Sequence, residues 1–149
     1  MSTAFEVEPA GYLLDTNAVS EWIKPRPDPG LIGWLHEADE ERMFLSVITI
    51  GEIRRGVDRM SDGRRKARLT TWLSEQVADR FDQRLLPVDF GVAQAWGRIR
   101  ARAEGVGQRV DAVDALIAAT AEAHGLAVVT RNRKDFRGTG VRLLCPWDE

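Results

Sequence analysis

The sequence predicts an α/β protein in which helices cover both faces of a parallel β-sheet. Short apolar runs alternate with amphipathic segments of helical spacing along the 149 residues, which is the pattern of repeated βα units. Apolar residues make up 44% of the chain and charged residues 30%. These are ordinary values for a globular protein, so a disordered chain is excluded.

The first half of the chain contains two predicted strands. Residues 11–15 form a short apolar run, and the helix that follows from residue 16 must end before Pro25 because proline cannot continue it. A second helix over about 30–38 carries Leu31 and Trp34 on one face, and MFLS at 43–46 is predicted as a buried strand. Apolar stripes predict two further helices, at about 48–57 and 63–81.

The second half continues the alternation. RLLPV at 84–88 is a candidate strand, and a helix over about 90–103 leads into a glycine-rich loop at 105–107. The next helix begins near Asp111, is almost wholly apolar through ALIAATA, and ends at Gly125. Strands are expected at 126–130 and 141–145.

Length and composition predict one domain, residues 11–149, after a short flexible leader at residues 1–10. Cys145 is the only cysteine, which excludes an intrachain disulfide and a thiolate zinc cluster and fits a reducing cytoplasm. No apolar run approaches the roughly 18 residues of a membrane span, so we expect no membrane partner. The net charge of −2 lacks the basic field of a non-specific nucleic-acid binder, so any contact with nucleic acid must be local.

Histidine and cysteine chemistry is disfavoured. The chain has only His36 and His124 and lacks a nucleophile elbow, a phosphate-binding loop and a dinucleotide fingerprint. His124 lies in the last turn of its helix, where the helix dipole favours a cation. The remaining candidates for chemistry are therefore carboxylates.

Four oxygen-bearing side chains are predicted at one edge of the sheet, where ligands of open α/β proteins bind. They are Asp15 at the end of the first strand, Glu52 and Asp114 early in helices, and Asn132 after the strand at 126–130. Structural roles remain open for them, since Asp15 could cap a helix and Glu52 could lie on a solvated face. We assign capping to Asp111. Asp114 borders so apolar a helix that it must pair or bind a cation.

An acidic cluster without histidine or cysteine favours Mg²⁺, for which Mn²⁺ can substitute. Such a site suits in-line attack of metal-activated water on a phosphodiester. A Mg²⁺-dependent phosphatase or phospho-receiver is an alternative, although it would normally need a second acid beside Asp15 and a lysine after a late strand.

Ordered motifs make the chain resemble PIN-domain ribonucleases, specifically the VapC-like and FitB-like toxins of type II toxin–antitoxin pairs. The motifs are LLDTNAVSE at 13–21, LSVITIGEIRRGV at 45–57, DALIAATAEAHGLAVVTRNRKDF at 114–136 and PW at 146–147. The resemblance implies a three-layer αβα fold with a central parallel sheet, a Mg²⁺-dependent endoribonuclease, a homodimer and a cognate antitoxin. A PIN domain whose site has degenerated into a binding module is the non-enzymatic alternative.

Carried over position by position, the resemblance implies that Asp15, Glu52 and Asp114 organise the metal. Asp15 and Asp114 would bind it directly and Glu52 could act through water. Thr16, Asn17 and Thr130 match supporting polar positions. At the fourth position some relatives have Asp where Asn132 stands, so either Asn132 serves through its amide, Asp135 supplies the acid, or the site holds one metal.

RNA requires local positive charge. Arg54, Arg131, Arg133 and Lys134 are the phosphate contacts that we predict, with Arg55 and Arg137 nearby in sequence. Trp22 is the candidate for a contact with a protein partner because tryptophan is frequent in interface hot spots. Trp34, Trp72 and Trp96 are predicted in the core.

Overall fold

Parallel strands form the centre of the computed structural model, which describes residues 8–147. Within these residues the sheet has five strands in the order β3-β2-β1-β4-β5. They are β1 (Gly11–Leu14), β2 (Met43–Ser46), β3 (Leu85–Leu86), β4 (Leu126–Val129) and β5 (Leu143–Leu144). The chain moves outward from β1 to β3 and then returns to place β4 on the other side of β1. The strand order therefore reverses between β1 and β4, the point at which open α/β sheets bind ligands.

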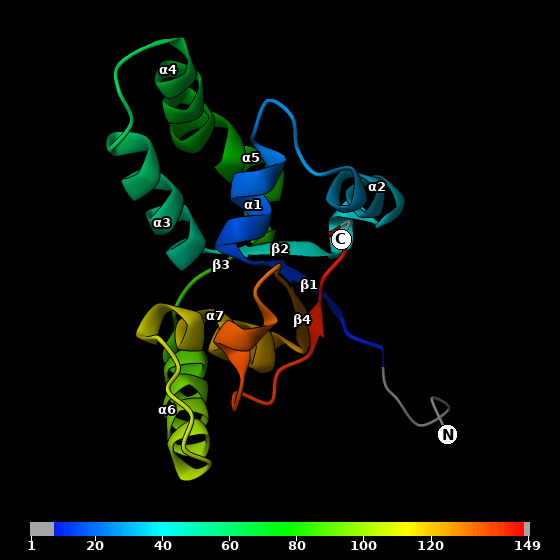
Figure 1. Ribbon diagram of the computed structural model, residues 1–149, viewed down its shortest axis with the longest axis vertical. Helices are drawn as coiled ribbons and strands as arrows, with labels where there is room; N and C mark the ends of the chain where they lie inside the picture. Colours follow the sequence, from blue (N-terminus) through cyan, green and yellow to red (C-terminus); the bar gives the residue numbers. More distant parts are fainter. Residues whose placement is uncertain (1–7, 148–149) are drawn as a thin grey trace.

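Helices cover both faces of the sheet, as predicted. Figure 1 shows α1 to α5 on one side of the strands and α6 and α7 on the other. The α-helices are α1 (Thr16–Trp22), α2 (Pro29–Glu37), α3 (Val47–Asp58), α4 (Arg64–Thr71), α5 (Val77–Phe81), α6 (Phe90–Gly105) and α7 (Ala112–His124). Short 3-10 helices lie at η2 (Glu40–Arg42), η4 (Asp82–Arg84) and η5 (Arg133–Phe136). The three-layer αβα architecture is confirmed.

The two cores follow from the alternation of side chains along each strand. Leu14 and Val129 pack into the core beneath α1 to α5, whereas their neighbours Leu13 and Val128 pack into the core with α6 and α7. All four side chains are at most 1% exposed. The strands are apolar throughout because each buries both faces.

Two glycines are required by backbone geometry. A Cβ atom at Gly11 would collide with the carbonyl oxygen of Arg42, so β1 and the start of β2 can approach closely only with glycine there. Gly125 has a φ of 68° and caps the C-terminus of α7 in the left-handed region, as predicted. Its carbonyl accepts the N–H of Ala10 at 2.9 Å. The first seven residues of the predicted leader lie outside the described residues.

Three predicted elements differ in extent. The helix expected at 63–81 is interrupted by a π-helix, η3 (Trp72–Gln76), which nothing in the sequence pattern signalled. The strand expected at 84–88 pairs only at Leu85 and Leu86, because Pro87 has no N–H to continue the ladder. The strand expected at 141–145 is likewise reduced to Leu143–Leu144, between a turn at Thr139 and Pro146.

The three tryptophans predicted in the core do pack against it, but they are not fully buried. Trp34, Trp72 and Trp96 are half-buried and pack against the cores, while Trp147 is the buried one, at 6% exposed. Trp22 packs edge to face on Phe81, with ring centroids 6.5 Å apart. Part of the Trp22 side chain thus packs against other residues of this protein. Its contact with a protein partner stays a prediction.

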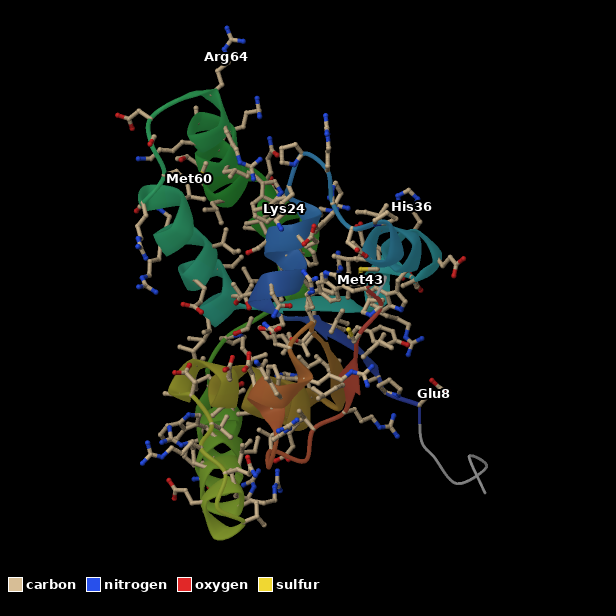
Figure 2. All side chains as sticks on the ribbon, viewed as in Figure 1. Glu8, Lys24, His36, Met43, Met60 and Arg64 are labelled. Carbon is tan, nitrogen blue, oxygen red and sulfur yellow. The ribbon has the colours of Figure 1, made fainter. Side chains whose placement is uncertain are left out.

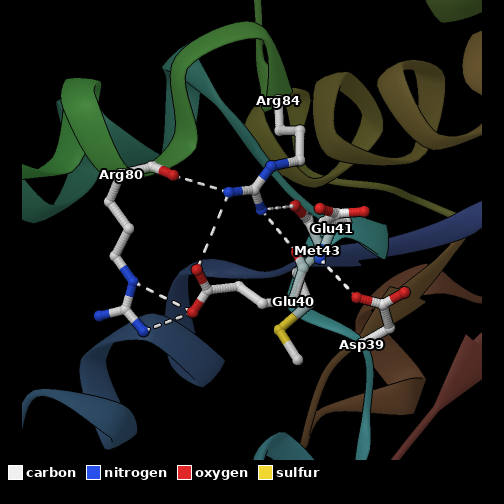
Figure 3. Close-up of polar contacts among 6 residues, drawn as sticks. All are labelled: Asp39, Glu40, Glu41, Met43, Arg80 and Arg84. Carbon is white, nitrogen blue, oxygen red and sulfur yellow. Dashed lines mark hydrogen bonds and ion pairs between the residues drawn. The ribbon is translucent and has the colours of Figure 1, made fainter.

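Arg84 ties η2 and β2 to α5, as Figure 3 shows. Its guanidinium donates to the carbonyl oxygens of Glu40 at 2.6 Å, Met43 at 2.8 Å and Arg80 at 2.6 Å. Arg80 in turn donates to the Glu40 carboxylate at 2.6 Å, and this hydrogen bond lowers the pKa of Glu40. Within residues 8–147 no helix is long and apolar enough to cross a membrane.

Candidate active site

A cavity of about 540 Å³ opens at the carboxyl ends of β1 and β4, where the strand order reverses. It is polar and draws residues from segments far apart in the sequence. Its lining residues are Asp15, Thr16, Asn17, Ser20, Glu21, Lys24, Glu52, Asp114, Arg131, Asn132, Asp135 and Trp147. The three predicted acids, the two candidates for the fourth position, and the polar pair Thr16 and Asn17 therefore share one site.

Asp15 caps α1 and also joins β1 to β4. Its Oδ1 accepts the N–H of Thr16 at 2.7 Å, and its Oδ2 accepts the hydroxyl of Thr130 at 2.8 Å and the amide of Asn17 at 3.1 Å. The Asn17 carbonyl oxygen accepts the backbone N–H of Arg131 at 3.1 Å. Capping and site formation are thus one arrangement, because the donors that fix the cap also fix the carboxylate in the cavity.

Burial raises the pKa of Asp15 above its ordinary value, since the residue is only 5% exposed. The hydrogen bonds from Thr130 and Thr16 act in the opposite direction, and the charges of Asp135 and Glu52 raise the pKa further. The pKa of Asp15 therefore depends on the charges of two other acids of the site.

Asp111 has the capping role that was predicted, whereas Asp114 lies in the cavity. Asp111 caps α7 and accepts the N–H of Val113 at 3.1 Å. Asp114 lines the cavity, and its pKa is raised to about 7, first by burial and then by the negative charges of Asp15, Asp135, Asp111 and Glu52. The site is therefore a concentration of negative charge that a cation would relieve.

The two candidates for the fourth position differ in their surroundings. Asn132 is exposed, and its backbone N–H donates to the Thr130 hydroxyl at 3.1 Å. Asp135, on η5, is half-buried, and its charge raises the pKa of both Asp15 and Asp114. Asp135 is the one of the two that is electrostatically coupled to the other acids.

Of the predicted phosphate contacts, Arg131 lines the cavity. Arg54 instead pairs with Asp58 on the exposed side of α3, with Nε 3.2 Å from Oδ1. Arg133 and Lys134 are exposed on η5 and lie outside the lining of the cavity. The structure thus brings one of the four predicted cations into the site.

Sequence reasoning missed four lining residues, Ser20, Glu21, Lys24 and Trp147. The first three follow Asn17 at helical spacing, so the periodicity of residues 16–24 carried a usable signal. Glu21 is only 8% exposed. Trp147 lies near the end of the chain, and no local pattern connected it to the site.

The donor set consists of oxygen atoms. Among the described residues, no three histidine, cysteine, aspartate or glutamate side chains are close enough to hold a metal ion together. Carboxylate and amide oxygens are ligands that suit Mg²⁺, which binds through one or two carboxylates and keeps several waters. The buried Thr16 hydroxyl, which has no hydrogen-bond partner among the described residues, also fits a cavity for a hydrated ion.

These features define an open α/β protein with an acidic, oxygen-only site at the switch point of its sheet. The family model described as "PIN domain" matches residues 12–141. The chain therefore belongs to the PIN-domain family, and within it to the group that includes the FitB and VapC toxins.

Two curated relatives and one solved structure illustrate the likeness. Toxin FitB of Neisseria gonorrhoeae is 37% identical, covering 92% of this chain and 99% of that protein. VapC ribonuclease Y4jK of Sinorhizobium fredii is 34% identical, covering 91% of this chain and 97% of that protein. The crystal structure of FitAcB from Neisseria gonorrhoeae superimposes with a TM-score of 0.86 at 37% identity, covering 93% of this chain and 99% of that chain.

Proposed function

We propose that this protein is a Mg²⁺-dependent endoribonuclease that acts as the toxin of a type II toxin–antitoxin pair. The observation that carries the proposal is the convergence of Asp15, Glu52, Asp114 and Asp135 on one cavity in a chain of the PIN family. Two close relatives are named as a toxin and a ribonuclease. These names also argue against the phosphatase, phospho-receiver and degenerate-module alternatives.

Asp15 and Asp114 are the direct metal ligands in this proposal. They are the two acids whose pKa values the other carboxylates raise, so a divalent cation relieves most repulsion between them. Glu52 acts through water, and Mn²⁺ can take the place of Mg²⁺. We assign the fourth acid to Asp135 because its charge acts on both ligands, with Asn132 on the rim of the cavity.

The chain's own residues contribute positioning and charge. Thr130 and Asn17 hold the Asp15 carboxylate in one orientation through their hydrogen bonds. Asp114, with a pKa near 7, releases its proton when a cation enters. When bound, the metal supplies Lewis acidity toward the phosphodiester and activates the attacking water.

The partners in the proposal are RNA, a cognate antitoxin and a second copy of the chain. A toxin that degrades RNA must be restrained in the growing cell, so a short neighbouring gene for the antitoxin is expected. The cytoplasm is the compartment where RNA and antitoxin would meet the protein.

Purified protein freed of any antitoxin should cleave total RNA in the presence of Mg²⁺, and cleavage should stop when EDTA removes the metal. The Asp15→Asn, Asp114→Asn double variant should be inactive in Mg²⁺. Asp111→Asn is the matched control, because Asn caps helices as well as Asp and the substitution removes a neighbouring charge without removing a ligand. RNA cleavage that persists in EDTA or in the double variant contradicts the proposal.

A further inference from the structure

We propose that Lys24 binds a phosphate of the RNA substrate inside the cavity and that the buried Glu21 positions it. This inference rests on the proposed function and extends it to two residues for which the sequence patterns predicted no role. It names a part of the substrate-binding machinery on the α1 side of the site, where Figure 2 shows Lys24.

Lys24 and Glu21, three residues apart, form an ion pair in which the lysine is exposed and the carboxylate is buried. Lys24 Nζ lies 3.1 Å from Glu21 Oε1, and the two side chains are 53% and 11% exposed. The second carboxylate oxygen of Glu21 accepts the backbone N–H of Asp28 at 3.1 Å. Glu21 is thus held at both oxygens, by the lysine and by the backbone of the proline-rich segment that contains Asp28.

Burial distinguishes this pair from an ordinary surface ion pair. Two exposed side chains three residues apart on a helix contribute little to stability. A buried carboxylate is costly unless donors satisfy it, and here the lysine is one of two donors. The exposed ammonium group has three N–H donors, so it can bind Glu21 and still offer donors to the cavity.

The acids that line the cavity outnumber its cations, so a phosphate that enters needs a nearby positive charge. Among its lining residues the acids are Asp15, Glu21, Glu52, Asp114 and Asp135, and the cations are Lys24 and Arg131. A phosphodiester that enters must meet positive charge beyond that of a metal, because the acids repel it. Lys24 follows α1 and Arg131 follows β4, so the two cations reach the substrate from different elements.

The test compares Lys24→Met with Lys66→Met. Lys66 is the matched control because it also pairs with an acid, with Nζ 3.3 Å from Asp62 Oδ1, but lies on α4 and outside the cavity. Binding of a short single-stranded oligoribonucleotide is measured by fluorescence anisotropy at several salt concentrations. The Asp114→Asn background prevents cleavage during the measurement.

Loss of one phosphate contact should weaken binding by about fivefold for Lys24→Met and reduce the slope of log K against log salt by about 0.7. Lys66→Met should leave both quantities unchanged. Lys24→Arg keeps the charge and should restore the slope. In the otherwise native enzyme, Lys24→Met should also lower kcat/KM for RNA cleavage by about fivefold or more.

Glu21 is tested as a positioning residue by a double-mutant cycle. Glu21→Gln should lower kcat/KM when Lys24 is present and have no such effect in the Lys24→Met background. Thermal unfolding of each variant separates this coupling from simple destabilisation. A Glu21→Gln loss of equal size in both backgrounds overturns the positioning role.

Failure of this inference can be told apart from failure of the proposed function. If Mg²⁺-dependent cleavage is present but Lys24→Met binds RNA with the affinity and salt slope of its parent, the role of Lys24 is wrong and the nuclease stands. If the native protein neither binds nor cleaves RNA, the proposed function itself is wrong.

Discussion

Asp114 is the residue whose pKa is raised by all the neighbouring acids of the site. Its pKa rises from 3.8 to about 7 because of burial and the neighbouring carboxylates. Between these two values the folded protein holds a proton that the unfolded chain has released. Folding without metal therefore becomes less favourable as pH rises through this window, and the penalty is complete above pH 7.

Asp114→Asn removes this penalty because the amide is never charged. In EDTA, the melting temperature of Asp114→Asn minus that of the native protein should increase from pH 4 to pH 7 and then level off. Circular dichroism melts across this range measure the difference. A difference that does not change with pH would mean that the pKa of Asp114 is close to its ordinary value.

Asp82 is the one non-glycine residue with positive φ in the described part of the chain, at φ 41° and ψ −114°. This conformation suits glycine and strains a residue with a Cβ atom. Asp82→Gly should raise the free energy of unfolding by about 1 kcal/mol, as measured by urea denaturation. Asp82→Ala keeps the Cβ atom and should give no such gain.

At the scale of elements, hydrogen bonds from side chains join segments that strand pairing alone does not fix. Thr130 at the end of β4 donates to Asp15 at the end of β1, so the two strand ends that shape the cavity are held in register. Arg84 does the same at the other edge of the sheet through the carbonyl groups of η2, β2 and α5.

Replacing Arg84 with Ala should lower the free energy of unfolding by about 2 kcal/mol, because hydrogen bonds from a charged donor are lost at three carbonyl groups. Arg54→Ala is the comparison, since its exposed pair with Asp58 at i,i+4 is worth only about 0.3–0.5 kcal/mol. Equal losses in the two variants would mean that Arg84 does not clamp these elements. Guanidinium denaturation provides the values.

At the scale of the whole molecule, metal binding and folding are linked. The acids come from four separate elements, so the folded protein presents a site that the unfolded chain lacks. Mg²⁺ at about 100 times its dissociation constant should therefore add about 2.7 kcal/mol to the free energy of unfolding. Urea denaturation with and without Mg²⁺ tests this, and the Asp15→Asn, Asp114→Asn double variant should gain nothing.

The alternation of apolar runs and helical stripes was sufficient to predict the order of strands and helices, the burial of α7 and the capping roles of Asp111 and Gly125. These are local properties, set by the spacing of side chains over a few residues. The same local logic placed Asp15, Glu52 and Asp114 at the ends or beginnings of elements that meet at one edge of a parallel sheet.

Only the tertiary structure decided which other side chains reach that edge. Arg54 was near Glu52 in sequence but points to Asp58. Glu21 and Trp147 lie within the quoted motifs and Lys24 lies outside them, and all three line the cavity although the sequence patterns predicted no role for them there. Asp135 is coupled to Asp15 and Asp114, and Asn132 lies exposed beside it. The sequence by itself determined the elements and the acids at their ends, because both depend on local spacing. The rest of the site depends on the rotation of each helix about its own axis when it packs. Contacts with distant parts of the chain set that rotation.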